Sequence, residues 1–114
     1  MSSNRPQSPH EIEAEIWLRI DELEALNDEY EVALAKEADK TVRYKAESAK
    51  RFLDQTEGTQ KFREAKVDWE MRQLHLEMET AKAVAKGIQA RMTSKRAIMD
   101  LLRTAAANLR TMTS

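Results

Sequence analysis

Lysines and arginines alternate with aromatic residues on both sides of Gly58, and these are the side chains whose types and spacing could do chemistry. Basic side chains neutralise phosphates and aromatic rings stack on bases, so the combination is typical of proteins that bind single-stranded nucleic acid. The predicted phosphate contacts are Lys45, Lys50, Arg51, Lys61, Arg63 and Lys66. The interleaved aromatic residues are Tyr44, Phe52, Phe62 and Trp69.

A packed and solvated helix surface is a second interpretation of the same segment. Acids interleave with the bases, and three of the rings, Phe52, Phe62 and Trp69, are expected in the core. Both interpretations stay open from composition alone.

Enzymatic chemistry has little support in the sequence. There is no cysteine, and neither His10 nor His75 has a second histidine at metal-ligand spacing. No glycine-rich phosphate loop or nucleophile elbow is present, and His75 is expected on a helix surface. We therefore expect no enzyme, no metal and no cofactor.

The elements that would position these residues are long helices, because a heptad stripe runs from Val67 to Leu109 with steps that alternate between four and three. Only Lys95 interrupts its apolar character. The stripe is Val67, Met71, Leu74, Met78, Ala81, Ala85, Ile88, Met92, Lys95, Met99, Leu102, Ala106 and Leu109.

An earlier helix should begin at Pro9, with Ser8 as N-cap and Glu11 completing a capping box, and should run to about residue 56. Its expected stripe drifts to steps of four after Leu34, and Asn27 could fix its register. The stripe is Ile16, Ile20, Leu23, Asn27, Tyr30, Leu34, Ala38, Val42, Ala46, Ala49 and Leu53.

Gly58 predicts a turn over about 57–59, and Thr59 can cap a second helix over about 60–110. The predicted fold class is therefore all-α, with two long antiparallel helices in one domain, 9–114, after a disordered arm, 1–8. Residue i should lie roughly opposite residue 117 − i. Gly87 then either allows a close approach at Tyr30 or is a tolerated helix glycine.

Charge is unevenly distributed along the chain. Residues 11–39 hold eleven acids against two bases, and residues 80–114 hold seven bases against one acid. This segregation fits a nucleic-acid partner or a charge-complementary pair of helices.

A second stripe on the far side of the later helix predicts a homo-oligomer, although a monomer that leaves Trp69 and Leu76 partly exposed stays an alternative. This stripe is Phe62, Trp69, Leu76, Ala83, Ala90 and Ala97. From both stripes of this helix, the residues predicted for oligomerisation are Val67, Trp69, Met71, Leu74, Leu76, Met78, Ile88, Met92, Met99 and Leu102.

Features of targeting are missing from the sequence. No signal pattern or membrane-length apolar run is present, and the lack of cysteine fits a reducing cytosol. We expect a soluble protein of the cytoplasm, or of the host cytoplasm if a phage encodes it.

The stretch from Lys50 to Gly58, KRFLDQTEG, with the following Phe62-Arg63-Glu64-Ala65, resembles the UvsY-type recombination mediators of tailed phages. The similarity covers roughly residues 40–110. It implies ring-like homo-oligomers that bind single-stranded DNA and help a RecA-like recombinase displace single-strand binding protein. Lys50 matches a family DNA contact, whereas Phe52 replaces a second family base and has Arg51 beside it. The family's C-terminal helix drives oligomerisation.

The rival expectation is a structural or assembly coiled-coil protein, such as a virion-assembly or scaffolding factor, with no DNA affinity.

Overall fold

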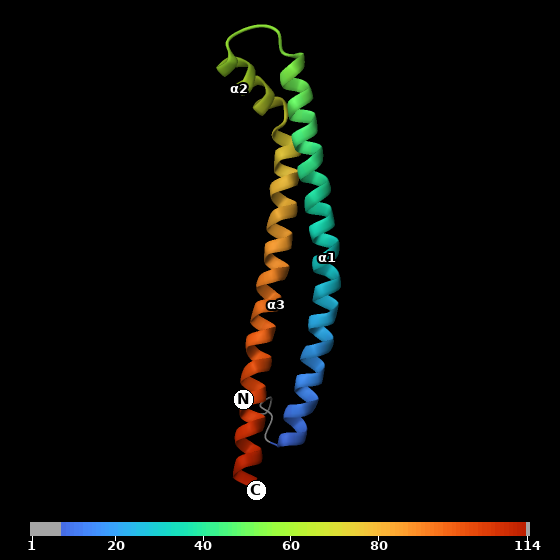
Figure 1. Cartoon of the computed structure of the whole chain (residues 1–114), viewed down its shortest axis with the longest axis vertical. Coiled ribbons are helices and arrows are strands. Elements are labelled where there is room, and N and C mark those ends of the chain that lie inside the picture. The colour runs from blue at the N-terminus through green and yellow to red at the C-terminus, as the bar shows by residue number, and fades with distance from the viewer. Residues whose placement is uncertain (1–7, 114) are drawn as a thin grey trace. The chain divides into compact units, whose positions relative to one another are not determined.

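The computed structural model describes residues 8–113, and within that range the chain forms three helices and no strand. They are α1 (Pro9–Asp54), α2 (Gln60–Glu70) and α3 (Arg72–Thr113), with a loop over 55–59 between α1 and α2 (Figure 1). The all-α fold class is therefore confirmed. Apart from Ser8, the predicted arm, 1–8, lies outside the described residues.

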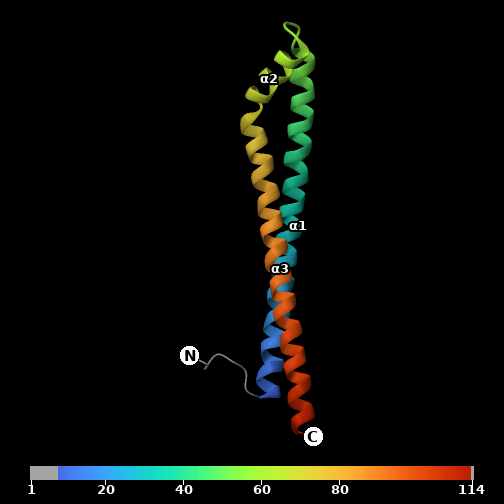
Figure 2. The same ribbon diagram turned by 90° about the vertical axis from the view of Figure 1, so that its left-hand side faces the viewer.

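The contacts divide the chain into two compact units. Unit 2, Tyr30–Gly87, is a helical hairpin made of the end of α1, the loop, α2 and the start of α3. Unit 1 pairs α1 up to Glu29 with α3 from Ile88 onward. In each unit α1 and α3 run antiparallel, as their colours show in Figures 1 and 2, which confirms the predicted pairing. The single domain predicted for 9–114 is thus described as two units.

The predicted heptad stripe of the later helix is the core stripe of the structure. Each of its thirteen positions is buried or half-buried, including Lys95. Six of the residues predicted for oligomerisation are buried in this intrachain core. The prediction is corrected for these six, because a side chain covered by its own chain has little surface left for a second copy. The six are Val67, Met71, Met78, Ile88, Met92 and Met99.

Leu74 and Leu102, which were also assigned to oligomerisation, are half-buried in the same stripe. Trp69 and Leu76 are exposed, with 67% and 58% of their surfaces accessible. These two residues are therefore the members of the predicted oligomerisation set that remain available to a second copy.

The core stripe of α1 differs from the prediction at Asn27, where Leu26 is buried instead, and again beyond Tyr30. The expected drift to steps of four is wrong, because Leu34, Val42 and Leu53 are exposed, as is Asn27. The core stripe instead consists of buried and half-buried residues that keep the heptad spacing to the end of the helix. They are Ile12, Ile16, Arg19, Leu23, Leu26, Tyr30, Ala33, Glu37, Lys40, Tyr44, Glu47 and Arg51.

Polar residues can occupy this stripe because opposite charges meet them from the other helix. Lys40 lies 3.6 Å from Glu77, and Arg51 lies 3.2 Å from Glu70. The helix period therefore decides which face packs, and ion pairing lets charged side chains share that face.

Side-chain caps begin α1 and α2 as the sequence predicts. The Ser8 hydroxyl accepts a hydrogen bond from the Glu11 N–H at 3.1 Å. The Thr59 hydroxyl accepts one from the Phe62 N–H at 3.2 Å. Each cap satisfies a backbone donor that the first turn leaves unpaired.

The loop between α1 and α2 depends on Gly58, whose φ of +88° lies in the left-handed region. A Cβ at this position would lie only 2.6 Å from Cδ1 of Phe62. The helix before it ends at Asp54, two residues earlier than predicted, so the turn is longer than the expected 57–59.

The prediction of one continuous helix over 60–110 is wrong. The helix is interrupted at Met71, because α2 ends at Glu70 and α3 begins at Arg72. Met71 has φ −94° and ψ 3°, which turns its peptide out of helical geometry. Two backbone bonds still span the joint, from the Met71 N–H to the Val67 carbonyl at 2.8 Å and from the His75 N–H to the Met71 carbonyl at 2.9 Å. The heptad stripe consequently continues in phase on both sides.

The ion pairs between the helices agree with the predicted alignment of residue i roughly opposite residue 117 − i, since the numbers of the paired residues add to between 117 and 123. The residue numbers of Glu22 and Lys95 in unit 1, and those of Lys40 and Glu77 in unit 2, each add to 117. Gly87, by contrast, has no heavy atom within 4 Å of the position that a Cβ would take. The close approach considered for Gly87 is therefore wrong, and the tolerated helix glycine is the better description.

The acidic part of α1 pairs with the basic part of α3, as expected from their charges. In unit 1, Arg91 lies 3.8 Å from Glu29 and Arg110 lies 2.9 Å from Glu13. Lys95 also bonds Glu22, and this hydrogen bond lowers the pKa of the Glu22 carboxyl below its ordinary value of 4.5. The predicted complementarity between the two helices is confirmed for these residues.

Candidate nucleic-acid interface

The short helix α2 has two faces of different character. Val67 is buried, and Arg63 and Glu70 are half-buried. These three residues have the spacing i, i+4, i+7, so they form the face of α2 that packs against α1 and the loop. Phe62, Lys66 and Trp69 have the same spacing on the adjacent face, one residue earlier, and all three are exposed. Phe62 and Trp69 expose 59% and 67% of their surfaces, so the expectation that both rings lie in the core is wrong.

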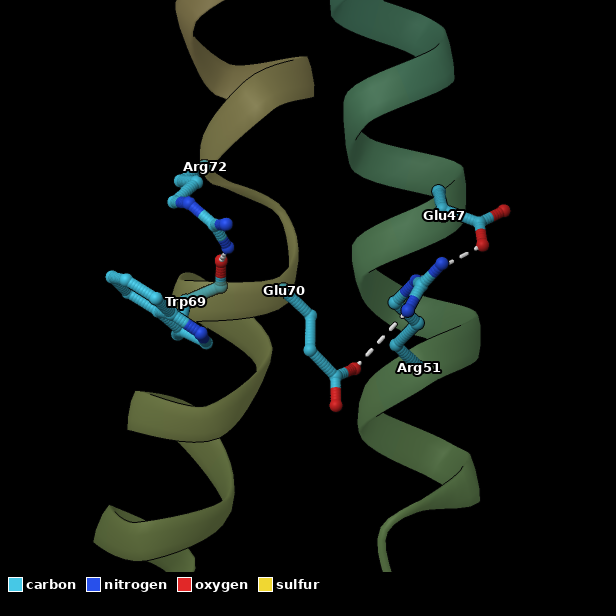
Figure 3. A network of polar contacts seen from close by, with 5 residues as sticks. All are labelled: Glu47, Arg51, Trp69, Glu70 and Arg72. Carbon is cyan, nitrogen blue, oxygen red and sulfur yellow. Dashed lines mark hydrogen bonds and ion pairs between the residues drawn. The ribbon is translucent and has the colours of Figure 1, made fainter.

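A basic side chain covers the Trp69 ring. The guanidinium carbon of Arg72 lies 3.9 Å from the ring centroid, and an Arg72 N–H donates to the Trp69 carbonyl at 2.7 Å (Figure 3). The Trp69 carbonyl also accepts from the Met71 N–H at the end of α2, so the Arg72 hydrogen bond adds a second donor to it. The same side chain thus stabilises the joint at Met71 and presents a positive charge beside an exposed indole.

Arg51 is held between two carboxylates. It donates to Glu47 at 3.1 Å and to Glu70 at 3.2 Å, and so ties the last residue of α2 to α1 (Figure 3). The hydrogen bond to Glu70, followed by that to Glu47, raises the pKa of the Arg51 guanidinium above its ordinary value. The phosphate contact predicted for Arg51 is corrected to a structural role, because its Nε and Nη1 are both bonded to carboxylates.

Arg63 also makes contacts within the chain. It donates to the Gln55 carbonyl at 3.4 Å, and its guanidinium lies 5.6 Å from the centroid of the half-buried Phe52 ring. The phosphate contact predicted for Arg63 is therefore also corrected: its contacts fasten the start of α2 to the loop. Arg51 and Arg63 together position both ends of the helix.

The other four predicted contacts are exposed lysines on two helices. Lys61 and Lys66 lie on α2 with Phe62 and Trp69, whereas Lys45 and Lys50 lie on α1. Among residues 8–113, no ion pair is recorded for any of these four ammonium groups. Lys66 shares the face of Phe62 and Trp69, and Lys61 lies beside Phe62 on the same helix, whereas Lys45 and Lys50 lie on a different helix.

A hollow in the surface of unit 2 adjoins this face. It has a volume of about 400 Å³ and is lined by Tyr44, Asp68, Arg72 and His75. The rings of Tyr44 and His75 are 5.3 Å apart and tilted by 51°. His75 is exposed as predicted, and its Nε2 lies 3.6 Å from a Glu79 carboxylate oxygen. Planar rings next to a guanidinium are side chains that can contact a nucleobase.

Arg72 is the residue that sequence reasoning missed. It follows Trp69 by three residues, so the two share a face of any continuous helix. That spacing could have indicated an arginine stacked on the ring, but the predicted phosphate contacts include no residue beyond Lys66.

Within residues 8–113, no cluster of three or more His, Asp or Glu side chains could hold a metal ion. In the same part of the chain, no helix is both long and apolar enough to cross a membrane. Comparison of the sequence with family models and with curated proteins, and of the fold with solved structures, found no match.

Proposed function

We propose that this protein binds single-stranded DNA through the exposed face of α2 and acts as a recombination mediator. In that role it helps a RecA-like recombinase to load by displacing single-strand binding protein, without catalysing a reaction or holding a cofactor. The observation that carries the proposal is the exposure of Phe62 and Trp69 on the side of α2 that also bears Lys66.

The exposure of two large rings requires an explanation, because α2 already packs against the rest of the chain through Val67. Burying either ring would stabilise the chain by about 1.5–3 kcal/mol, so its exposure sacrifices stability. Base stacking on the rings, with phosphates on Lys61 and Lys66, uses the surface that the fold leaves open. Arg72 adds a charge beside the Trp69 ring at 3.9 Å.

Anisotropy of a labelled oligo-dT strand, measured at low and high salt with a duplex control, tests the binding. Trp69→Ala should weaken the affinity by about 5- to 150-fold, the loss that corresponds to one stacked base. Lys66→Ala should weaken it less and lower the slope of log affinity against log salt by about 0.7, the value for one phosphate contact to a single strand. Lys86→Ala, an exposed lysine on α3, is the matched control and should bind normally.

Tryptophan fluorescence separates stacking from a purely electrostatic encounter. The chain has two tryptophans, so Trp17→Phe leaves Trp69 as the only reporter. Quenching of Trp69 by oligo-dT supports the proposal. Binding that leaves Trp69 emission unchanged, or no binding at high micromolar protein, contradicts it.

The second candidate is a structural or assembly coiled-coil protein without DNA affinity. It is favoured by the exposure of the second stripe of α3, Leu76, Ala83, Ala90 and Ala97, none of which is covered in a single chain. Oligomers that bind neither single strands nor duplex would support it.

A further inference from the structure

Helix α1 carries a second stripe on the side opposite its core, with the same alternation of four and three residues. We name this the outward stripe. Its members in unit 1 are Ala14, Leu18, Asp21, Ala25 and Asp28. Its members in unit 2 are Val32, Ala35, Asp39, Val42, Ala46, Ala49 and Leu53.

All twelve side chains of the outward stripe are exposed, and nine of them are apolar. Leu18, Val32, Val42 and Leu53 each expose more than half of their surfaces. Charged residues make up 34% of the chain, so a fully exposed heptad stripe with three charges among twelve positions is unusually apolar. An apolar heptad stripe is the surface that a partner helix covers.

The charges beside the outward stripe indicate which helix that is. In unit 1 the flanking residues are the acids Glu15, Glu22, Glu24 and Glu29. In unit 2 they are the bases Lys36, Arg43, Lys45 and Lys50, together with one acid, Glu31, which falls opposite Ala38 in the alignment proposed below. An antiparallel second copy of α1 places the bases of one copy against the acids of the other, whereas a parallel copy places acids against acids.

We propose that two copies of this chain pair through the outward stripes of their α1 helices, antiparallel, with residue i of one copy opposite residue 67 − i of the other. This interface is separate from the α2 face and does not depend on DNA binding. It also differs from the oligomerisation predicted through the later helix.

The proposed alignment brings apolar residues together along the stripe. Leu18 lies opposite Ala49, Ala25 opposite Val42, and Val32 opposite Ala35, each twice because the pair of helices is twofold symmetric. Small residues on one side of each contact let the helices approach closely.

The flanking charges are complementary in the same alignment. The pairs between copies, each within two residues of exact opposition because they flank the stripe, are Glu15 with Lys50, Glu22 with Arg43, Glu24 with Lys45, and Glu29 with Lys36. Glu15, Glu22, Glu29 and Arg43 also have ion-pair partners within their own chain, so they would share their charge between two contacts. Shifting the alignment by one heptad places either Glu29 or Lys36 opposite its own counterpart, so neighbouring registers bring like charges together.

One unfavourable contact remains, between Asp28 and Asp39. Asp39 already lies 3.6 Å from Arg43 in its own chain, which offsets part of its charge. The pair Glu24 and Lys45 is the best probe, because both side chains are exposed and neither has a recorded ion pair among residues 8–113.

The proposal is tested by exchanging the charges of Glu24 and Lys45 and measuring the dimerisation affinity of each variant. Sedimentation equilibrium suits this measurement, because it distinguishes the 13.1 kDa chain from its dimer. Glu24→Lys alone and Lys45→Glu alone should each weaken association by about tenfold, because each change creates two like-charged contacts in a twofold dimer. The double variant should restore the wild-type affinity. Mixing the two single variants should also restore it, because each then meets an opposite charge on the other.

Lys86→Glu is the control, because Lys86 is an exposed base on α3 outside the outward stripe, and it should associate as the wild type does. Far-ultraviolet circular dichroism should show full helicity for every variant, as expected for exposed positions. A wild-type monomer at high micromolar concentration would overturn the proposal. So would a double variant that stays as weak as the single ones. If Lys45 served only to bind DNA, Lys45→Glu would associate as the wild type does, and that result would overturn the proposal too.

Discussion

Replacing Gly87 with alanine should stabilise this protein. Gly87 lies inside α3, its φ is not positive, and an added Cβ would meet no heavy atom within 4 Å. Glycine costs a helix interior about 1 kcal/mol relative to alanine, and no steric term opposes the gain here. For a chain of this length, 1 kcal/mol corresponds to a rise in melting temperature of about 4 °C.

The assay is thermal and urea unfolding followed by circular dichroism at the helical band, with Gly58→Ala as the matched control. Gly58 has φ +88°, and its added Cβ would lie 2.6 Å from the Phe62 ring. We expect Gly58→Ala to destabilise the chain by about 1–2 kcal/mol, the cost of the left-handed region for a residue with a Cβ. The same substitution thus has opposite signs at the two glycines.

A loss of stability in Gly87→Ala would refute this reasoning. It would mean that another group occupies the space beside Gly87 in solution, as a second copy on the outer side of α3 would. Measuring the effect over a range of protein concentrations identifies that case, because only a contact between copies depends on concentration.

Two further predictions concern the core and its charges. Met71→Ala should destabilise the chain by about 2–5 kcal/mol through the cavity it leaves, since Met71 is 1% exposed, whereas Met112→Ala, at 80% exposed, should change stability little in the same urea titration. Because the folded-state pKa of Glu22 is lowered from 4.5, its contribution to stability is present above pH 4.5 and is lost as the pH falls through the folded value. Urea midpoints at pH 6 and pH 3 should therefore differ less in Glu22→Gln than in the wild type, and an unchanged difference would contradict this assignment.

The sequence predicted the helices well where apolar residues mark the packed face. The stripe from Val67 to Leu109 is regular and apolar, and each of its positions is buried or half-buried. The caps at Ser8 and Thr59 were predictable for the same reason, because a single side chain and its spacing determine them.

The prediction failed where charged residues occupy the core stripe. Following apolar residues alone led from Leu34 to Val42 and Leu53, which are exposed. The true face passes through Lys40 and Arg51, whose acids lie on another helix and are identified only once the helices are aligned. No glycine or proline near Met71 indicates the helix break in the sequence.

The candidate site was predictable in its residue types but not in its members. Arg51 and Arg63 could not be told from Lys61 and Lys66 by sequence, because their structural roles depend on Glu70 and the Gln55 carbonyl. Exposure of the two rings depends on which face of an 11-residue helix packs, and Val67 determines that face.

The arrangement of partners along the chain also determines an order of folding. Arg51 and Glu70 are 19 residues apart, Lys95 and Glu22 are 73 apart, and Arg110 and Glu13 are 97 apart. Bringing distant segments together costs entropy, and that cost is smallest next to the 55–59 loop. Unit 2 should therefore close first and shorten the gap that unit 1 must bridge, so a chain emerging from the ribosome cannot complete unit 1 until almost all of α3 has been made.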